Sequence, residues 1–217
     1  EVAEQLQNYL NDGGEILNGE LVSKQVPVTV YAEQTPNPAV MKFVANKMLV
    51  DELQEFKSID DTKSAPLAQA LFHFSYVKEV FIDTNYISIT KYEVADWDSI
   101  TMEIREFVRA HLADGKAVIT QLAEKKQHSE KAPNIERTPT EQQIVKILDE
   151  YIKPAVASDG GNIAFSQYDE AKKEVEVVLQ GACSGCPSST FTLKNGIENM
   201  LKEMMPGKVA TVSAING

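Results

Sequence analysis

The chain has 217 residues, of which 43% are hydrophobic and 24% are charged, as is usual for a soluble globular protein with one large or two small domains. The formal net charge of −11 argues against nucleic acid and anionic membranes as partners, because both recruit basic surfaces. No apolar run approaches membrane-spanning length. The first residue is Glu1, so we expect a preceding segment, such as a removed targeting peptide, to be missing from this sequence.

Residues 1–25 form an N-terminal extension with a short amphipathic helical pattern that ends at Asp12-Gly13-Gly14. The next segment, 26–123, mixes strand and helix patterns and is predicted to be a domain. Its expected elements, in order, are strands at 26–31 and 41–44, a helix from Pro66, a hairpin of strands at 77–82 and 86–90, and a helix from Asp96 or Asp98 to Asp114-Gly115. This order predicts an α+β domain in which helices cover a mainly antiparallel sheet.

Candidate functional residues are sparse in this first domain. His73 lies beside the apolar face of its helix and His111 near the end of another helix, so we interpret them as packing or surface residues rather than metal ligands. Asn37 and Lys42 lie in or near a segment that two prolines make rigid, and rigid loops often carry function. Nothing in the domain indicates catalysis.

A polar linker and a second domain follow. Residues 124–137 contain a single large apolar residue, Ile135, as expected of a solvated linker. Residues 138–217 then read as a second α+β domain, with two helices on one face of a three-stranded sheet. Its expected elements are a helix opened by a capping box at Thr138-Pro139-Thr140-Glu141, with Ile144, Ile147, Leu148, Tyr151 and Ile152 buried and a kink or end at Pro154, a turn at Asp159-Gly160-Gly161, a hairpin at 162–168 and 174–180, a helix at 188–205 and a strand at 209–215.

Both cysteines of the chain lie between the second strand of that hairpin and the following helix, as Cys183-x-x-Cys186. Pro187 suits the first position of a helix, which places Cys186 at the helix N-terminus, where the dipole and free N–H groups favour a thiolate. Two sulfurs at this spacing can close a disulfide, supply half of a soft-metal site or pack as small hydrophobic groups. We expect the Asp159-Gly160-Gly161 turn to end the preceding helix and to pack beside this loop.

A metal site built on the two cysteines is incomplete in one subunit. Structural zinc and iron–sulfur clusters usually take four ligands, and the chain has no second cysteine pair and no histidine at ligand spacing. A two-fold axis through the motif would bring two pairs together, so one hypothesis is a four-thiolate site shared by a homodimer. The alternatives are a dithiol/disulfide oxidoreductase and a structural dimer held by zinc.

The second domain carries a resemblance to a known family in its longer motifs. Those motifs are Asp159-Gly160-Gly161-Asn162-Ile163, Leu179-x-Gly181-x-Cys183-x-x-Cys186-Pro187-Ser188-Ser189, and Thr192-Leu193-Lys194-x-Gly196-Ile197-Glu198-x-x-Leu201. Together they resemble the NifU-like C-terminal domain of iron–sulfur cluster scaffolds and carriers. The resemblance implies that Cys183 and Cys186 bind a cluster, commonly [4Fe-4S] with [2Fe-2S] as the alternative, bridged between two subunits.

The first domain resembles the domain that precedes the NifU-like domain in Nfu-type proteins, over about residues 26–112. The matching features are Thr35-Pro36-Asn37-Pro38-x-x-x-Lys42-Phe43, the Pro66-Leu67-Ala68 helix start and the 77–90 hairpin, although Ala65 stands where a serine is expected. This resemblance implies that the domain docks partner proteins.

The two resemblances together imply a carrier without enzymatic activity. Such a carrier would be a homodimer when loaded, would receive its cluster from an upstream assembly scaffold and would pass it to apo iron–sulfur proteins, with no nucleic acid or membrane partner. Two cysteines in one motif are not a secreted disulfide framework, so we expect a reducing compartment. We predict a bacterial cytoplasm, with an organelle matrix as the alternative.

Overall fold

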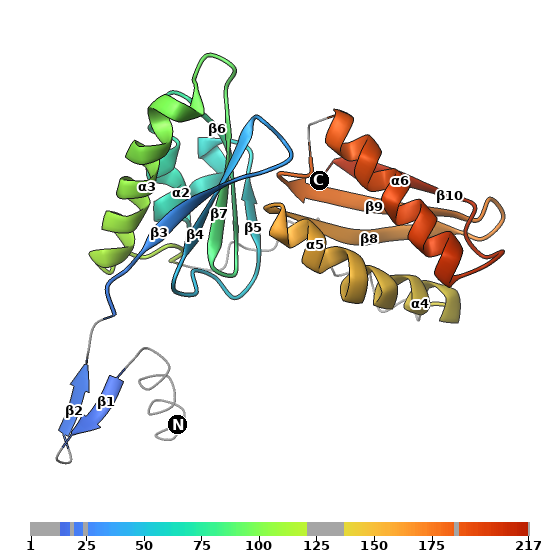
Figure 1. The fold of residues 1–217 in the computed structure, drawn as a ribbon, viewed down its shortest axis with the longest axis horizontal. Coiled ribbons are helices and arrows are strands. Elements are labelled where there is room, and N and C mark those ends of the chain that lie inside the picture. Colours follow the sequence, from blue (N-terminus) through green and yellow to red (C-terminus); the bar gives the residue numbers. More distant parts are fainter. Residues whose placement is uncertain (1–13, 18–19, 24–25, 121–136, 185–186, 217) are drawn as a thin grey trace.

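The computed structural model describes residues 14–17, 20–23, 26–120, 137–184 and 187–216. Figure 1 shows two domains side by side, each a sheet with helices, and a two-stranded hairpin preceding them, formed by β1 (Gly14–Leu17) and β2 (Glu20–Ser23). The predicted α+β class with two small domains is confirmed. The amphipathic pattern before Asp12 lies outside the described residues, and the hairpin after it is an element that the sequence did not predict.

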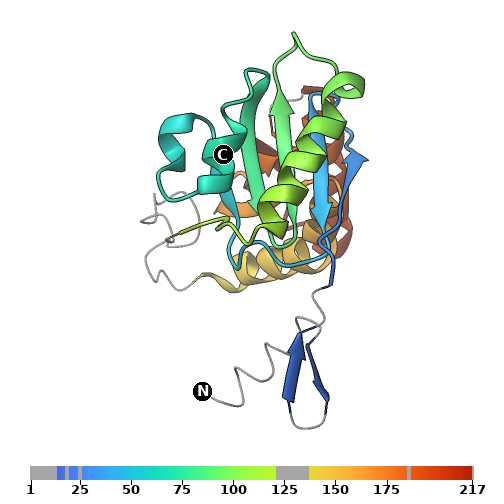
Figure 2. The ribbon, with the colours of Figure 1, turned by 90° about the vertical axis from the view of Figure 1, so that its left-hand side faces the viewer.

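The N-terminal domain contains a five-stranded antiparallel sheet with the order β3-β4-β7-β6-β5. Its strands are β3 (Val30–Gln34), β4 (Val40–Ala45), β5 (Gln54–Phe56), β6 (Val77–Asp83) and β7 (Tyr86–Lys91). The helices are η1 (Ile59–Thr62), α2 (Pro66–Leu71) and α3 (Trp97–Ala113). Figure 2 shows α2 and α3 lying across one face of the sheet. Apolar side chains between the two layers, such as Phe43, Leu67, Ile89 and Ile104, are fully buried there.

The strands of this domain differ from the prediction at three places. The first begins at Val30, because the pairing with β4 starts there, whereas the hydrogen bonds of Pro27 and Thr29 go to Asn46 alone. The hairpin turn is one residue shorter than expected, since Asp83 pairs directly with Tyr86. The three-residue β5 was missed because its Gln-Glu-Phe sequence has no apolar run.

The C-terminal domain has a three-stranded sheet with the order β10-β9-β8. Its strands are β8 (Gly161–Asp169), β9 (Glu174–Gly181) and β10 (Thr211–Asn216), and its helices are α4 (Pro139–Ile147), the π-helical turn η2 (Leu148–Ile152), α5 (Lys153–Ser158) and α6 (Pro187–Met204). β9 is antiparallel to β8 and parallel to β10, and α6 provides the crossover that a parallel pair needs. The helices lie on one face of the sheet (Figure 1), as the sequence predicted.

The first helix of this domain does not end at Pro154, because α4, η2 and α5 follow one another without a break. Its predicted capping box is confirmed: the Thr138 hydroxyl accepts from the Glu141 amide at 3.2 Å, and the Glu141 carboxylate accepts from the Thr138 amide at 2.7 Å. Just before Pro154 the helix widens into η2, where the Lys153 amide donates to the Leu148 carbonyl. The wider turn rotates the helix face, so Tyr151, which was predicted to be buried, is 47% exposed.

Candidate functional site

The Cys183 loop joins β9 to α6, as the sequence predicted. β9 ends at Gly181, whose φ of +62° lets the chain turn sharply, and α6 begins at Pro187. Cys183 is only 7% exposed and packs with the apolar core of the C-terminal domain. Cys186 lies outside the described residues, so its position at the helix N-terminus stays a prediction.

The turn at 159–161 lies directly against Cys183. Gly160, with φ of +82°, accepts a hydrogen bond from the Ala182 amide at 3.2 Å. A Cβ atom at Gly161 would lie 2.7 Å from Cys183 Sγ and 2.7 Å from the Gln180 carbonyl oxygen, which is much closer than ordinary contact. The expectation that this turn packs beside the cysteine loop is therefore confirmed, and only glycine fits at 161 without movement of its neighbours.

Local hydrogen bonds hold the loop in place. Ser184 turns back onto the Gly181 carbonyl through its amide at 3.1 Å and its hydroxyl at 3.0 Å. The Thr190 hydroxyl donates to the Cys183 carbonyl at 3.3 Å, which ties the loop to the first turns of α6. On the other side, Asn162 donates to the Gln180 side chain at 2.9 Å and braces the end of β9. Cys183 therefore sits on a well-supported backbone.

The electrostatic environment of Cys183 favours its neutral form in the absence of metal. Burial, with a smaller contribution from the Asp159 charge, raises the pKa of the Cys183 thiol to about 12. Loss of the proton at this position therefore has to be coupled to a strong thiolate partner, and a metal ion provides one. A thiol with a raised pKa is also a poor nucleophile at neutral pH, which argues against Cys183 as the attacking group of an oxidoreductase.

No second ligand set accompanies Cys183 in the described part of the chain. No group of three or more His, Cys, Asp or Glu side chains gathers there in a way that could hold a metal ion. His111 is buried, with Nε2 3.0 Å from the Ala117 carbonyl oxygen, which agrees with its interpretation as a packing residue. His73 is exposed on the surface.

The N-terminal domain also contacts the cysteine loop. Asn37 Nδ2 donates to the Ala182 carbonyl at 3.1 Å and is 3.4 Å from the Ser184 carbonyl. The Glu55 carboxylate accepts from the Gly181 amide at 3.1 Å. Asn37 was a candidate because of its rigid loop, whereas Glu55 was missed because it lies in the unpredicted strand β5.

Comparison with known proteins gives matches along most of the chain. The family described as "Scaffold protein Nfu/NifU N terminal" matches residues 30–115, and the family described as "NifU-like domain" matches residues 144–212. The protein named "NFU1 iron-sulfur cluster scaffold homolog, mitochondrial" from Drosophila erecta is 32% identical over 201 residues, covering 89% of this chain and 69% of the relative. The chain belongs to the Nfu family.

Other relatives of this Nfu chain have similar sequence identity and coverage. The protein of the same name from Drosophila willistoni is 34% identical, with 82% of this chain and 60% of the relative covered. "NifU-like protein 4, mitochondrial" from Arabidopsis thaliana is 33% identical, with 79% and 61% covered. The Nfu chain thus spans 60 to 69% of the length of these relatives. A solution structure of a NifU-like protein from Saccharomyces cerevisiae aligns with 46% of this chain and 92% of its own, at 24% identity and a TM-score of 0.41.

Proposed function

We propose that this chain is an iron–sulfur cluster scaffold and carrier, which binds a [4Fe-4S] cluster between two subunits through Cys183 and Cys186 and delivers it to apoproteins. The observation that carries the proposal is the cysteine loop, with Cys183 held between β9 and α6 and seated against Gly161. The two family matches support it, and so do the relatives named as iron–sulfur cluster scaffolds.

The ligand count is the reason for placing the cluster between subunits. Iron–sulfur clusters are usually held by four thiolates, and this sequence contains two cysteines. A second copy of the chain supplies the other two, and a [2Fe-2S] cluster at the same position is the alternative cargo. A cluster held this way is labile, because separating the subunits removes half of its ligands. Lability suits transfer to another protein and would serve a permanent redox centre badly.

The remaining parts of the proposal concern partners and compartment. The chain acts without catalysis of its own, receives the cluster from an upstream assembly scaffold and passes it to apo iron–sulfur proteins. Among the described helices, none has the length and apolar character needed to cross a membrane. The relatives named as mitochondrial support the organelle matrix, which was the alternative to the bacterial cytoplasm.

Anaerobic reconstitution with iron and sulfide tests the proposal, read by visible absorption and native mass. We expect a dimer with about four irons and four sulfides. Cys183→Ser and Cys186→Ser should each abolish the chromophore, whereas the control Ser184→Ala, in the same loop, should keep it. A variant that still assembles the full chromophore would remove that cysteine from the ligand set. A colourless monomer that cycles between dithiol and disulfide would overturn the carrier function in favour of an oxidoreductase.

A further inference from the structure

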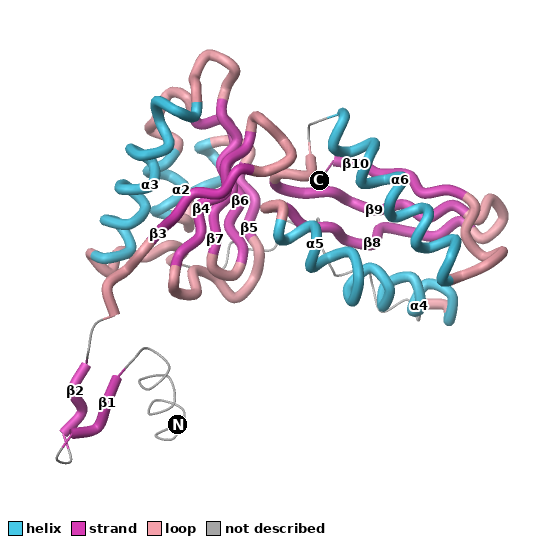
Figure 3. Tube along the Cα trace, in the orientation of Figure 1, coloured by secondary structure: helices cyan, strands magenta, loops and turns pink. Residues whose placement is uncertain are grey.

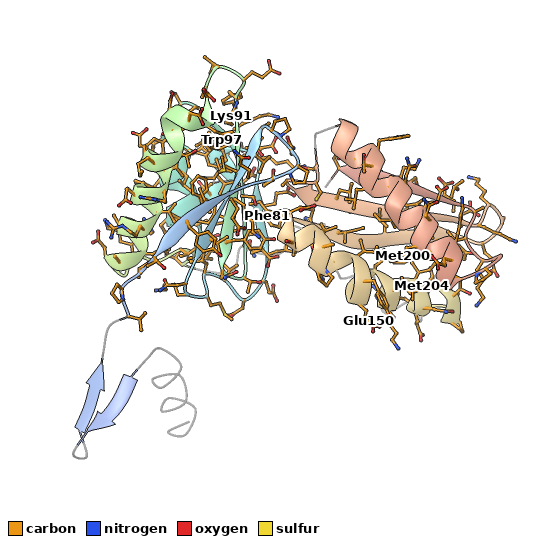
Figure 4. The ribbon with its side chains drawn as sticks, viewed as in Figure 1. Phe81, Lys91, Trp97, Glu150, Met200 and Met204 are labelled. Carbon is orange, nitrogen blue, oxygen red and sulfur yellow. The ribbon has the colours of Figure 1, made fainter. Side chains whose placement is uncertain are left out.

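The sheet of the N-terminal domain has a second face, opposite α2 and α3, that is also buried. An antiparallel sheet commonly leaves one face to water. Here Val44, Phe81 and Tyr86 form a separate apolar cluster on that second face, and Phe81, Tyr86 and Ser88 are only 2%, 5% and 2% exposed. Figure 4 shows Phe81 at the side of the sheet that meets the C-terminal domain. The second domain therefore covers this face.

The contact is made by a small set of side chains that we call the docking face. The docking face comprises Asn37, in the loop before β4, together with Lys42, Glu55, Phe81, Tyr86 and Ser88 on the strands. The strand residues share one side of the sheet, because Lys42 and Phe81 both pair with Ser88 and Glu55 pairs with Phe81.

Four donors of the docking face reach main-chain carbonyls of the C-terminal domain. The bonds run from Ser88 Oγ to Gly160 O at 2.6 Å, from Tyr86 OH to Gly161 O at 3.2 Å, from Lys42 Nζ to Ser158 O at 3.0 Å, and from Asn37 Nδ2 to Ala182 O at 3.1 Å. Glu55 works in the opposite sense and accepts from the amide of Gly181. These bonds hold the turn at 158–161 and the loop at 181–184 against the N-terminal sheet. Figure 3 shows both segments at the end of the C-terminal domain that meets that sheet.

The docking face is shaped to fit these turns. Phe81 Cγ lies 3.0 Å from where a Cβ of Gly181 would stand, so a side chain at position 181 would crowd the ring. Lys42 is 9% exposed, and its ammonium group lies 4.7 Å from the centre of the Tyr86 ring and 3.4 Å from the Glu33 carboxylate. The buried ammonium group of Lys42 therefore has partners within its own domain in addition to the Ser158 carbonyl.

The docked arrangement conflicts with sharing Cys183 between subunits. Asn37 holds the carbonyls of Ala182 and Ser184 on either side of Cys183, and Cys183 itself is nearly inaccessible. A second subunit has to bring its own cysteine loop within bonding distance of the same cluster. The docking face therefore occupies main-chain groups on either side of the cysteine that a second subunit has to approach.

We propose that the N-terminal domain is an intramolecular cap, which binds its own cysteine loop through the docking face and must move away before the loop can share a cluster with a second subunit. The second half of this inference rests on the proposed function. The two domains are joined by a segment that the sequence predicts to be a polar linker, so capping is a contact between tethered partners with a high effective concentration. The ligand of the docking face is therefore the main chain of residues 158–161 and 181–184 of the same molecule.

The reactivity of Cys183 in the apo full-length chain tests the cap. In a Cys186→Ser background Cys183 is the sole thiol, because the sequence has two cysteines. Two variants weaken the contact between the docking face and the C-terminal domain. Asn37→Asp keeps the acceptor that binds the Ala39 amide but turns a carboxylate toward two carbonyls. Ser88→Ala deletes the 2.6 Å bond to Gly160, whose carbonyl keeps the Ala182 amide.

We expect each variant to raise the rate of maleimide modification of Cys183 by about tenfold, because each removes one or two hydrogen bonds between the docking face and the C-terminal domain. The radius of gyration measured by small-angle scattering should rise with it. The control Met102→Ala changes an exposed residue of α3, on the far side of the domain, and should alter neither quantity. Circular dichroism establishes that each variant is folded.

The outcomes separate the cap from the cluster proposal. Folded variants with unchanged Cys183 reactivity and unchanged radius of gyration would overturn the cap, whatever the reconstitution experiment gives. Protection that grows with protein concentration would also overturn it, because the docking face would then be binding a second copy. In the background with both cysteines, the opened variants should form the cluster-bridged dimer faster than the parent. Equal rates would show that the contact does not restrict sharing.

Discussion

The replacement Gly161→Ala is the most direct test of how the turn supports Cys183. The new Cβ would stand 2.7 Å from Cys183 Sγ, 2.7 Å from the Gln180 carbonyl oxygen and 3.0 Å from the Cys183 amide nitrogen. Two of these three atoms are main chain and cannot rotate away. The backbone at Gly161 is not in the left-handed region, so the whole effect is steric. Either the start of β8 or the cysteine loop has to shift by several tenths of an ångström.

Overpacking of this kind costs about 1–3 kcal/mol, and we expect a value near the upper end because main-chain atoms are involved. The matched control is Gly196→Ala in α6, where a Cβ meets nothing within 4 Å. That substitution should stabilise the domain by about 0.5–1 kcal/mol, since alanine is the better helix former. The same glycine-to-alanine change is thus expected to lower the free energy of unfolding at position 161 and to raise it at position 196.

The assay is urea unfolding followed by two signals, because two domains need not unfold together. Trp97 is the single tryptophan of the chain and reports on the N-terminal domain, whereas far-ultraviolet circular dichroism reports on both domains. Iron content after reconstitution measures the site itself, and we expect Gly161→Ala to lose most of it. If this variant unfolds at the parental urea concentration and binds a full complement of iron, the close approach of Gly161 to Cys183 has no role in holding the site.

Three further changes have expected results. Glu198 accepts hydrogen bonds from Lys202 and from the Val212 amide, which hold its pKa below the usual value, so Glu198→Ala should cost about 1–2 kcal/mol at neutral pH. That cost should fade as the pH drops from neutral through the lowered pKa, in urea titrations at a series of acidic pH values; a constant cost would contradict the linkage. Burial raises the pKa of Glu55, with a smaller contribution from the Glu79 charge, whereas the Gly181 amide and Lys57 lower it. Docking should therefore become more favourable as the pH falls toward the range in which this carboxyl group takes up a proton. The radius of gyration should therefore shrink as the pH falls from neutral toward the ordinary carboxyl range, and Glu55→Gln should remove that dependence; an equal response of both proteins would refute it. Thr138→Ala removes the N-terminal capping side chain of α4 and should lower the free energy of unfolding by about 1 kcal/mol in thermal unfolding, without changing iron content. A loss of iron would show that this helix terminus also supports the cysteine site.

Much of the cysteine site could be predicted from local patterns. The alternating residues before Gly181 and the helical spacing after Pro187 placed Cys183 on a strand-to-helix turn, and the two glycines at 160 and 161 indicated a tight turn beside it. Tyr151 was misplaced because a π-helical turn changes the helical phase, and the sequence pattern assumes a constant one.

The docking face could not be predicted in the same way. Tyr86 and Ser88 alternate with Ile87 and Ile89, which indicates a strand with one apolar face and one mixed face. The pattern does not say what covers the mixed face. The partner groups are carbonyls of Gly160 and Gly161, and every residue has a carbonyl, so the C-terminal sequence carries no complementary signal.

Recognition through the main chain has a consequence for how the two domains tolerate mutation. The docking face binds main-chain carbonyls of Ser158, Ala182 and Ser184, so the exposed side chain of Ser158 is free to change under other demands, such as the fit to a recipient protein. Substitutions in the docking face have no such freedom, because each donor there binds a carbonyl whose position the C-terminal backbone fixes. Random mutagenesis should therefore give an asymmetric map of interdomain contact, with sensitive positions at the N-terminal donors and, opposite them, mainly at glycines.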